Sequence, residues 1–419
     1  MGSRGPRPPR SIAPAAWRRA FALLGLCLPW AAGAATCGAD PWPLWEDFQA
    51  RFIQDDGRVA DASTPQQHTS SEGQSYGMFF ALVAGDQATF DRLWKWTEAN
   101  LAGGDIGKHL PAWFWGHAPD GTWRVLDANA AADADLWLTY DLLEAARLWG
   151  RKDYAASAQA LLARIETEEV ADLPGLGKML LPGPKGFTLP GGIWRLNASY
   201  LPPPVLRRLA AAGKKDVWSA IARNTPAVYG AGLDTGYVPD WVAYVAPAAS
   251  AGKPAPAGAA GPRGRFATDP VKGDVGSYDA IRAYMWAGLT PNDDPLAAPL
   301  REATRGLAAA TAELGYPPES VRTATGVVDG TGHFGFSAAL LPYLQATNRT
   351  DLLNAQRARV QTLLDQARAK ADASRSQPPY YDYVLTLFGL GWSEERYRFQ
   401  AAGTVQPFWE KSCRRVSAP

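Results

Sequence analysis

The chain has 419 residues, of which 47% are hydrophobic and 20% are charged, a balance typical of folded globular proteins and unlike that of disordered chains. Residues 1–34 contain five Arg and no acid, so the formal net charge of +1 becomes 1 − 5 = −4 without them. A mildly acidic chain has no electrostatic basis for binding nucleic acid, which excludes that class of partner.

The amino terminus has the composition of a secretory signal peptide. Arg18 and Arg19 end a basic region, the apolar run 20–28 follows, and A-G-A at 32–34 is a typical cleavage site. The arginine pair also resembles a twin-arginine signal, so the export route stays open. The apolar run is shorter than the ~20 residues that span a bilayer. We therefore expect cleavage after A-G-A, no membrane span, and a periplasmic or secreted chain, 35–419, that forms one domain.

Two cysteines remain after the leader, Cys37 and Cys413, near opposite ends of the mature chain. In an oxidising compartment an even pair predicts one disulfide bond between them. Two free thiols are the alternative, although exposed free cysteines are a liability outside the cytosol.

Amphipathic patterns of helical period recur along the chain between Gly/Pro-rich loops, whereas the alternating patterns of strands are scarce. The predicted helices are 42–53, 72–84, 87–101, 133–149, 153–169, 203–212, 215–229, 279–289, 296–313, 335–346, 350–373 and 379–390. They predict an all-α architecture, and the lack of a fixed period disfavours a repeat solenoid. The low-complexity stretch 246–258 is predicted to be a surface loop within the domain.

The second predicted helix begins within the sequence SSEGQSYGMFFALV. Ser71 is its predicted N-cap, and Gln74 completes a capping box. The simplest interpretation of Glu72 is an acid that complements the helix dipole. Gly73 and Gly77, however, each reduce helix stability by about 1 kcal/mol relative to Ala. They predict that another group approaches the backbone there.

Two further predicted helices also begin with carboxylates. Asp133 and Asp135 open one of them, where dipole complementation is again the alternative. Asp279 opens the other, with Arg282 and Trp286 on the same helical face. An Asp beside an Arg keeps a low pKa and stays ionised, as a general base requires. The alternative interpretation of Asp279 and Arg282 is an ion pair on the surface of this helix.

Tryptophan is frequent, at 17 of 419 residues. Trp113, Trp115 and Trp194 lie in loop-like segments, where core packing or the stacking of sugar rings would explain them. One acid to protonate a leaving oxygen and one carboxylate to activate water are what sugar hydrolysis requires. Four His without ligand spacing disfavour a metal site. With no P-loop, G-x-S-x-G or dinucleotide motif, we expect no cofactor.

Three ordered motifs resemble those of glycoside hydrolase family 8. SEGQSYG at 71–77 resembles the acid motif of that family, ADAD at 132–135 with LLEA at 142–145 its second signature, and SYDAIR at 277–282 its base motif. PGLG, SYLPP and YVLTLFG further resemble the branch of periplasmic endoglucanases encoded with bacterial cellulose synthase. Ala132 departs from the usual Ser or Thr but leaves the carboxylates in place.

The resemblance implies an (α/α)6 barrel with an open groove and inverting endo-hydrolysis of a β-1,4-glucan (cellulose) chain. By position, Glu72 would be the general acid, Asp279 the base, and Asp133 the residue that binds the sugar at the cleavage point. The implied groove residues are Trp113, Trp115, Trp194, Tyr200, Tyr278, Arg282 and Tyr381. The implied role is support of cellulose biosynthesis and export, with the cellulose synthase export machinery as a further candidate partner.

Three expectations follow from this assignment. Burial and Asp133 should raise the pKa of Glu72 against the helix dipole. Inversion predicts that the carboxyl groups of Glu72 and Asp279 lie roughly 6.5–9.5 Å apart. Gly73 and Gly77 should let the groove floor approach the glucan. The alternatives are a hydrolase of xylan or chitosan, or a non-catalytic glucan-binding assembly protein.

Overall fold

The structure is a computed structural model that describes residues 1–2, 5, 41–231, 234–247 and 264–410. The predicted cleavage site, both Cys37 and Cys413, and most of the low-complexity loop lie outside the described residues. Among the residues that are described, no helix has the length and apolar character needed to cross a membrane.

Helices make up most of the described chain and confirm every predicted helix. In chain order they are α1 (Pro43–Phe52), α2 (Ser71–Ala84), α3 (Gln87–Asn100), α4 (Ala132–Trp149), α5 (Lys152–Glu168), the short 3-10 helix η1 (Ala198–Tyr200), α6 (Pro203–Ala212), α7 (Lys215–Gly230), α8 (Ala280–Leu289), α9 (Ala297–Ala303), α10 (Arg305–Leu314), α11 (Phe334–Ala346), α12 (Thr350–Ser374) and α13 (Tyr380–Ser393). The helix predicted over 296–313 is divided at Thr304 into α9 and α10.

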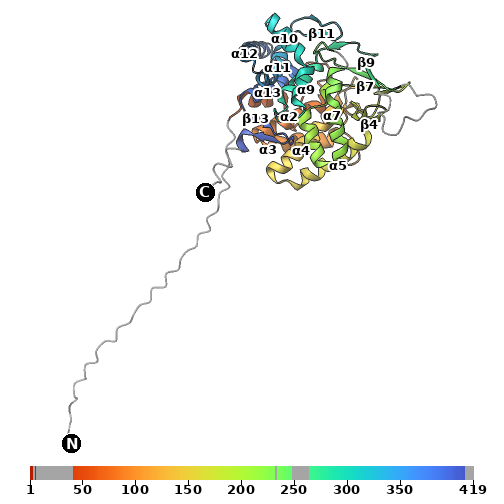
Figure 1. Ribbon diagram of the computed structural model, residues 1–419. Helices are drawn as coiled ribbons and strands as arrows, with labels where there is room; N and C mark the ends of the chain where they lie inside the picture. Colours follow the sequence, from red (N-terminus) through yellow and green to blue (C-terminus); the bar gives the residue numbers. More distant parts are fainter. Residues whose placement is uncertain (3–4, 6–40, 232–233, 248–263, 411–419) are drawn as a thin grey trace. The chain divides into compact units, whose positions relative to one another are not determined.

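The helices form two concentric layers. Helices α2, α4, α6, α8, α11 and α13 pack in chain order as an inner ring. Figure 1 shows α2 in orange and α13 in blue. The ring closes where Phe388 of α13 stacks on Phe79 of α2, with ring centroids 5.3 Å apart. Helices α1, α3, α5, α7, α9 and α12 alternate with them along the chain and cover them. This arrangement is an (α/α)6 barrel and confirms the predicted fold class.

Inner helices α2, α8, α11 and α13 are largely apolar on every side because they lie between the barrel core and the outer layer. All of Ala280–Leu289 in α8 is buried, as is Asp382–Gly391 in α13. Backbones also touch within the ring. A Cβ atom on Gly389 would overlap the carbonyl group of Ala338 in α11, so only glycine allows α13 to approach α11 this closely.

Short strands connect the helices, and the sequence analysis missed them. They are β1 (Thr69–Ser70), β2 (Phe114–His117), β3 (Trp123–Asp127), β4 (Val170–Leu173), β5 (Gly177–Leu180), β6 (Thr188–Leu189), β7 (Ile193–Leu196), β8 (Val242–Val245), β9 (Arg265–Thr268), β10 (Val275–Gly276), β11 (Ser320–Arg322), β12 (Val327–Asp329), β13 (Tyr397–Phe399) and β14 (Val405–Pro407). They form small antiparallel sheets in the orders β1-β2-β3, β4-β5, β6-β7-β8-β9, β10-β11-β12 and β13-β14. Strands this short contain too few positions for a recognisable alternation.

Candidate active site

The start of α2 differs from the predicted capping box. Ser70 is the N-cap, and its hydroxyl accepts the backbone N–H of Gly73 at 3.0 Å. Gln74 is buried instead, where its amide oxygen accepts the N–H of Val59 and its amide nitrogen donates to Thr97 of α3. The predicted capping box is therefore wrong, because this glutamine joins α2 to its outer neighbours rather than to its own first turn.

The two glycines of α2 make room for protein side chains. A Cβ atom on Gly73 would lie 2.9 Å from the hydroxyl of Tyr380, and one on Gly77 would lie 3.2 Å from Val59 and 3.4 Å from Leu93. A close approach to the backbone is thus confirmed at both positions. The prediction that a glucan chain makes this approach is wrong, because aromatic and aliphatic side chains occupy the space.

Arg282 of α8 connects three inner helices at the centre of the site. Its Nη1 donates to Asp133 of α4 at 2.7 Å and to the hydroxyl of Tyr76 of α2 at 2.9 Å. Its Nη2 donates to Asp279, directly before α8, at 3.1 Å. Only 6% of Arg282 is exposed, which rules out the alternative of a surface ion pair. The guanidinium therefore fixes two of the three predicted carboxylates in one place.

Glu72 lies beside this cluster at the start of α2. Burial, followed by Coulomb repulsion from Asp133, raises the pKa of Glu72 from 4.5 to about 8. Arg282 and the hydroxyl of Ser71, which donates to Oε2 at 3.3 Å, oppose that increase. The direction predicted from sequence is confirmed, and a carboxyl group protonated near neutral pH has the property that a general acid needs.

Activity is expected to fall as the pH rises through about 8, because Glu72 must be protonated to donate its proton. Because folding raises the pKa of Glu72, the protonated form of this group favours the folded state. Its contribution to the free energy of unfolding is therefore fully present below about pH 4.5 and is lost as the pH rises to about 8. The check is kcat/KM measured from about pH 4 to about pH 10, which reports the groups of the free enzyme. An alkaline limb centred near pH 5 would contradict the assignment.

Asp279 is held from two directions and still reaches solvent. Its Oδ1 accepts from Arg282, and its Oδ2 accepts the indole N–H of Trp241 at 2.9 Å. The side chain remains 35% exposed, so water has access to it. An oriented carboxylate in contact with water is the arrangement that a general base requires.

Asp240 supports the start of α8. Its Oδ1 accepts the backbone N–H groups of Ser277, Asp279 and Ala280 at 2.7, 3.1 and 2.8 Å, and so satisfies donors that a helix start leaves free. Burial, with repulsion from Asp279, raises the pKa of Asp240 to about 6. Sequence reasoning missed both Asp240 and Trp241, which lie in a loop nearly 40 residues before α8 and carry no helical pattern.

Three predicted tyrosines lie next to the carboxylates. The ring centroid of Tyr200 is 5.7 Å from the guanidinium carbon of Arg282. It is 6.2 Å from the ring centroid of Trp241. The hydroxyl of Tyr381 donates to the carbonyl oxygen of Tyr278 at 2.7 Å, directly before Asp279. Apolar ring faces therefore border the cluster, as a sugar-binding groove requires.

The three predicted tryptophans occupy different surroundings. The carbonyl oxygen of Trp113 accepts the N–H of Ser71, which places this residue at the start of α2. Trp115 packs between Trp96 and Trp123, with both ring centroids 5.2 Å away. Trp194 of β7 packs 6.3 Å from Tyr244 of β8. A groove position for each of the three stays a prediction.

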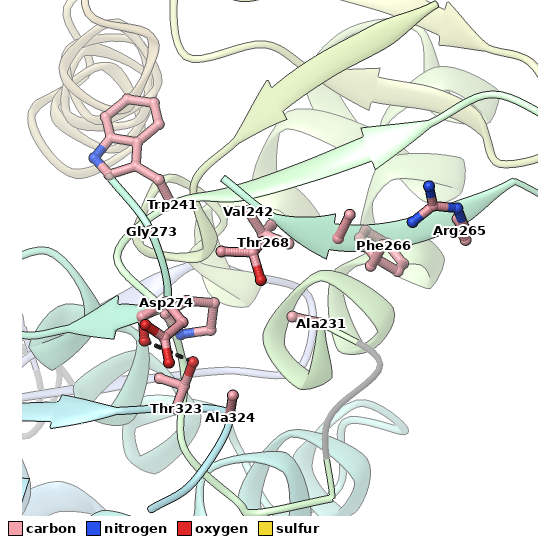
Figure 2. A pocket seen from close by; sticks show the side chains of 12 residues that line it. Ala231, Trp241, Val242, Arg265, Phe266, Thr268, Gly273, Asp274, Thr323 and Ala324 are labelled. Carbon is pink, nitrogen blue, oxygen red and sulfur yellow. Dashed lines mark hydrogen bonds between the residues drawn. The ribbon is translucent and has the colours of Figure 1, made fainter. Parts of the chain in front are cut away.

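A cavity of about 520 Å³ lies beside the site, along β8 and β9. Its lining includes Val242, Thr268, Asp274 and Thr323, and Figure 2 shows the indole of Trp241 extending away from these side chains. Trp241, whose indole donates to Asp279, is also among the residues that line this cavity. The cavity borders the carboxylate cluster without including it.

An inner ring of helices that holds a half-buried acid with a raised pKa and a second, water-accessible carboxylate is the arrangement of a two-carboxylate glycoside hydrolase. The family model described as Glycosyl hydrolases family 8 matches residues 16–395. The chain belongs to that family.

The most informative relatives are similar over nearly their full lengths. The chain is 44% identical to an endoglucanase of Pseudomonas fluorescens, covering 94% of this chain and 98% of that protein, and 47% identical to an endoglucanase of Xanthomonas axonopodis pv. citri, covering 91% and 93%. Among solved structures, the endo-1,4-D-glucanase of Vibrio fischeri has a TM-score of 0.77 at 37% identity, covering 88% of this chain and 100% of that one.

Proposed function

We propose that the protein is an endo-β-1,4-glucanase that hydrolyses internal bonds of a cellulose chain with inversion. The observation that carries the proposal is the division of roles between two carboxyl groups. Glu72 is half-buried and its pKa is raised to about 8, whereas Asp279 is oriented by two donors and is reached by water. The relatives described above are endoglucanases, which supports the substrate class.

In the proposed reaction, Glu72 donates its proton to the glycosidic oxygen while Asp279 takes a proton from the attacking water. The C–O bond to the leaving sugar breaks as the new bond forms on the opposite face, and the two carboxyl groups exchange protonation states until solvent restores them. Asp133, held by Arg282, would bind the sugar at the cleavage point. The separation of roughly 6.5–9.5 Å between the acid and the base stays a prediction.

The aromatic residues would hold the chain on either side of the cleavage point. Flat rings bind the C–H faces of sugars, and their polar edges accept or donate at the hydroxyl rim. The proposed groove residues are Trp113, Trp115, Trp194, Tyr200, Tyr278, Arg282 and Tyr381.

The proposed setting is the periplasm or the exterior. The basic and apolar composition of residues 1–34 supports a cleaved signal peptide, which would leave 35–419 as one catalytic domain with a Cys37–Cys413 disulfide bond. Resemblance to the endoglucanases encoded with cellulose synthase supports a role in cellulose biosynthesis and export. Contact with the export machinery is part of the same proposal.

The test is the viscosity of carboxymethylcellulose treated with the purified mature chain, with xylan and chitosan in parallel. An endo-acting glucanase lowers viscosity sharply while releasing few reducing ends, and an inverting one releases the α-anomer first, which proton NMR detects. If only xylan or only chitosan is cleaved, that polymer is the substrate instead of cellulose. A folded protein that binds glucan without cleaving any polymer would overturn the catalytic proposal, and initial β-anomer would overturn inversion.

A further inference from the structure

A second pair of carboxyl groups lies behind the site and has no part in the proposed reaction. Asp135 of α4 and Glu169, directly after α5, are both completely buried. None of their four carboxylate oxygens accepts a hydrogen bond from a donor among the described residues. Buried carboxylates without donors are rare because the loss of hydration strongly disfavours the charged form. The pair therefore requires an explanation.

The position of the pair follows from helix geometry. Two residues along a helix correspond to a rotation of about 200° around its axis. Asp135 therefore lies on the opposite side of α4 from Asp133. That side carries the contact with α5, whose C-terminal end places Glu169 next to Asp135. The negative end of the α5 dipole adds a further reason why Glu169 resists ionisation.

The charged groups that face the pair are themselves acidic. Asp133 of α4 and Glu72 of α2 act on Asp135, and Asp133 and Glu168 act on Glu169. The nearest cation along α5, Arg164, pairs with Glu168 at 2.5 Å. Two ionised carboxylates in such surroundings would repel each other in a medium of low dielectric constant, and one proton held between them relieves most of that repulsion.

We propose that Asp135 and Glu169 share one proton, hold a single negative charge behind Asp133, and are positioning residues that keep Glu72 protonated. Burial, the largest cause, raises the pKa of both carboxyl groups, which favours a proton on the pair. It rests on the proposed function, because it assigns the pair a task only if Glu72 is the general acid. A shared proton gives the pair the properties of one titrating unit rather than of two separate groups.

The experiment compares the pH profile of kcat/KM on carboxymethylcellulose for the mature wild type, Asp135→Asn, Glu169→Gln and the double variant. In each single variant the amide N–H replaces the shared proton, so the single negative charge remains and the alkaline limb should stay near its wild-type position. The double variant removes the charge, and its alkaline limb should move to lower pH by on the order of 1 unit. A purely structural role would lower activity at every pH without moving the limb.

The matched control is Asp141→Asn, two turns along α4, because Asp141 is also completely buried and without a donor among the described residues. Its alkaline limb should not move. An unmoved limb in an active double variant would overturn the inference, and so would a single variant that shifts as far as the double. If the double variant does not fold, carboxyl-carbon NMR of the wild type decides, since two independent titrations of Asp135 and Glu169 would overturn proton sharing. Failure of the proposed function is distinguishable, because the wild type would then cleave no glucan.

Discussion

Replacing Glu72 by Gln is expected to lower kcat on carboxymethylcellulose by about 10³-fold, within the range that general acid catalysis contributes. The amide has nearly the same shape as the carboxylic acid but cannot give a proton to the leaving oxygen. Because the native Glu72 is protonated at neutral pH, the neutral amide introduces no new charge into the site. We expect the substrate to bind with little change in KM and the protein to stay folded.

The measurement is the initial rate of viscosity loss, with circular dichroism to confirm folding. Glu98→Gln provides the control, since it makes the same chemical change on the outer helix α3 and should leave the rate unaltered. A Glu72→Gln protein that kept more than about a tenth of the wild-type rate would exclude Glu72 as the general acid.

The helices were predictable because inner and outer helices both leave strong local patterns. Most inner helices are apolar runs, and the outer helices show one buried stripe, as in α5, where Tyr154, Ala158, Leu161, Leu162 and Ile165 are buried. The strands were not predictable, because most arise where two loops lie side by side. Residues Thr69–Ser70 become a strand only because they pair with Phe114 and Trp115 of β2.

The site was only partly predictable, for a similar reason. Glu72, Asp133 and Asp279 all lie at helix starts, where sequence alone also allows dipole complementation for the first two and a surface ion pair for the third. What distinguishes them is their common neighbour Arg282, which is 149 residues from Asp133 in sequence. Trp241 likewise becomes part of the site only through its hydrogen bond to Asp279.

Replacing Arg282 by Met is expected to affect both stability and activity. Removing one partner of a buried ion pair leaves an uncompensated charge and typically costs about 3–5 kcal/mol. Asp133 is 1% exposed and receives its shortest hydrogen bond from Arg282, so the free energy of unfolding should fall by about that amount. Arg124→Met is the control, because its ion pair with Asp120 is exposed and should contribute little to the free energy of unfolding.

The activity of Arg282→Met should fall by on the order of 10²-fold or more, because both Asp133 and Asp279 lose the donor that orients them. The pH profile distinguishes this loss from a general loosening of the fold. Arg282 lowers the pKa of Glu72, so its removal should move the alkaline limb to higher pH. The Asp135→Asn, Glu169→Gln double variant should move the same limb to lower pH. The alkaline limb should thus shift in opposite directions when a cation and when an anion near Glu72 is removed, as expected if Glu72 is the group that titrates. A limb that moved the same way in both proteins would assign the titration to another residue.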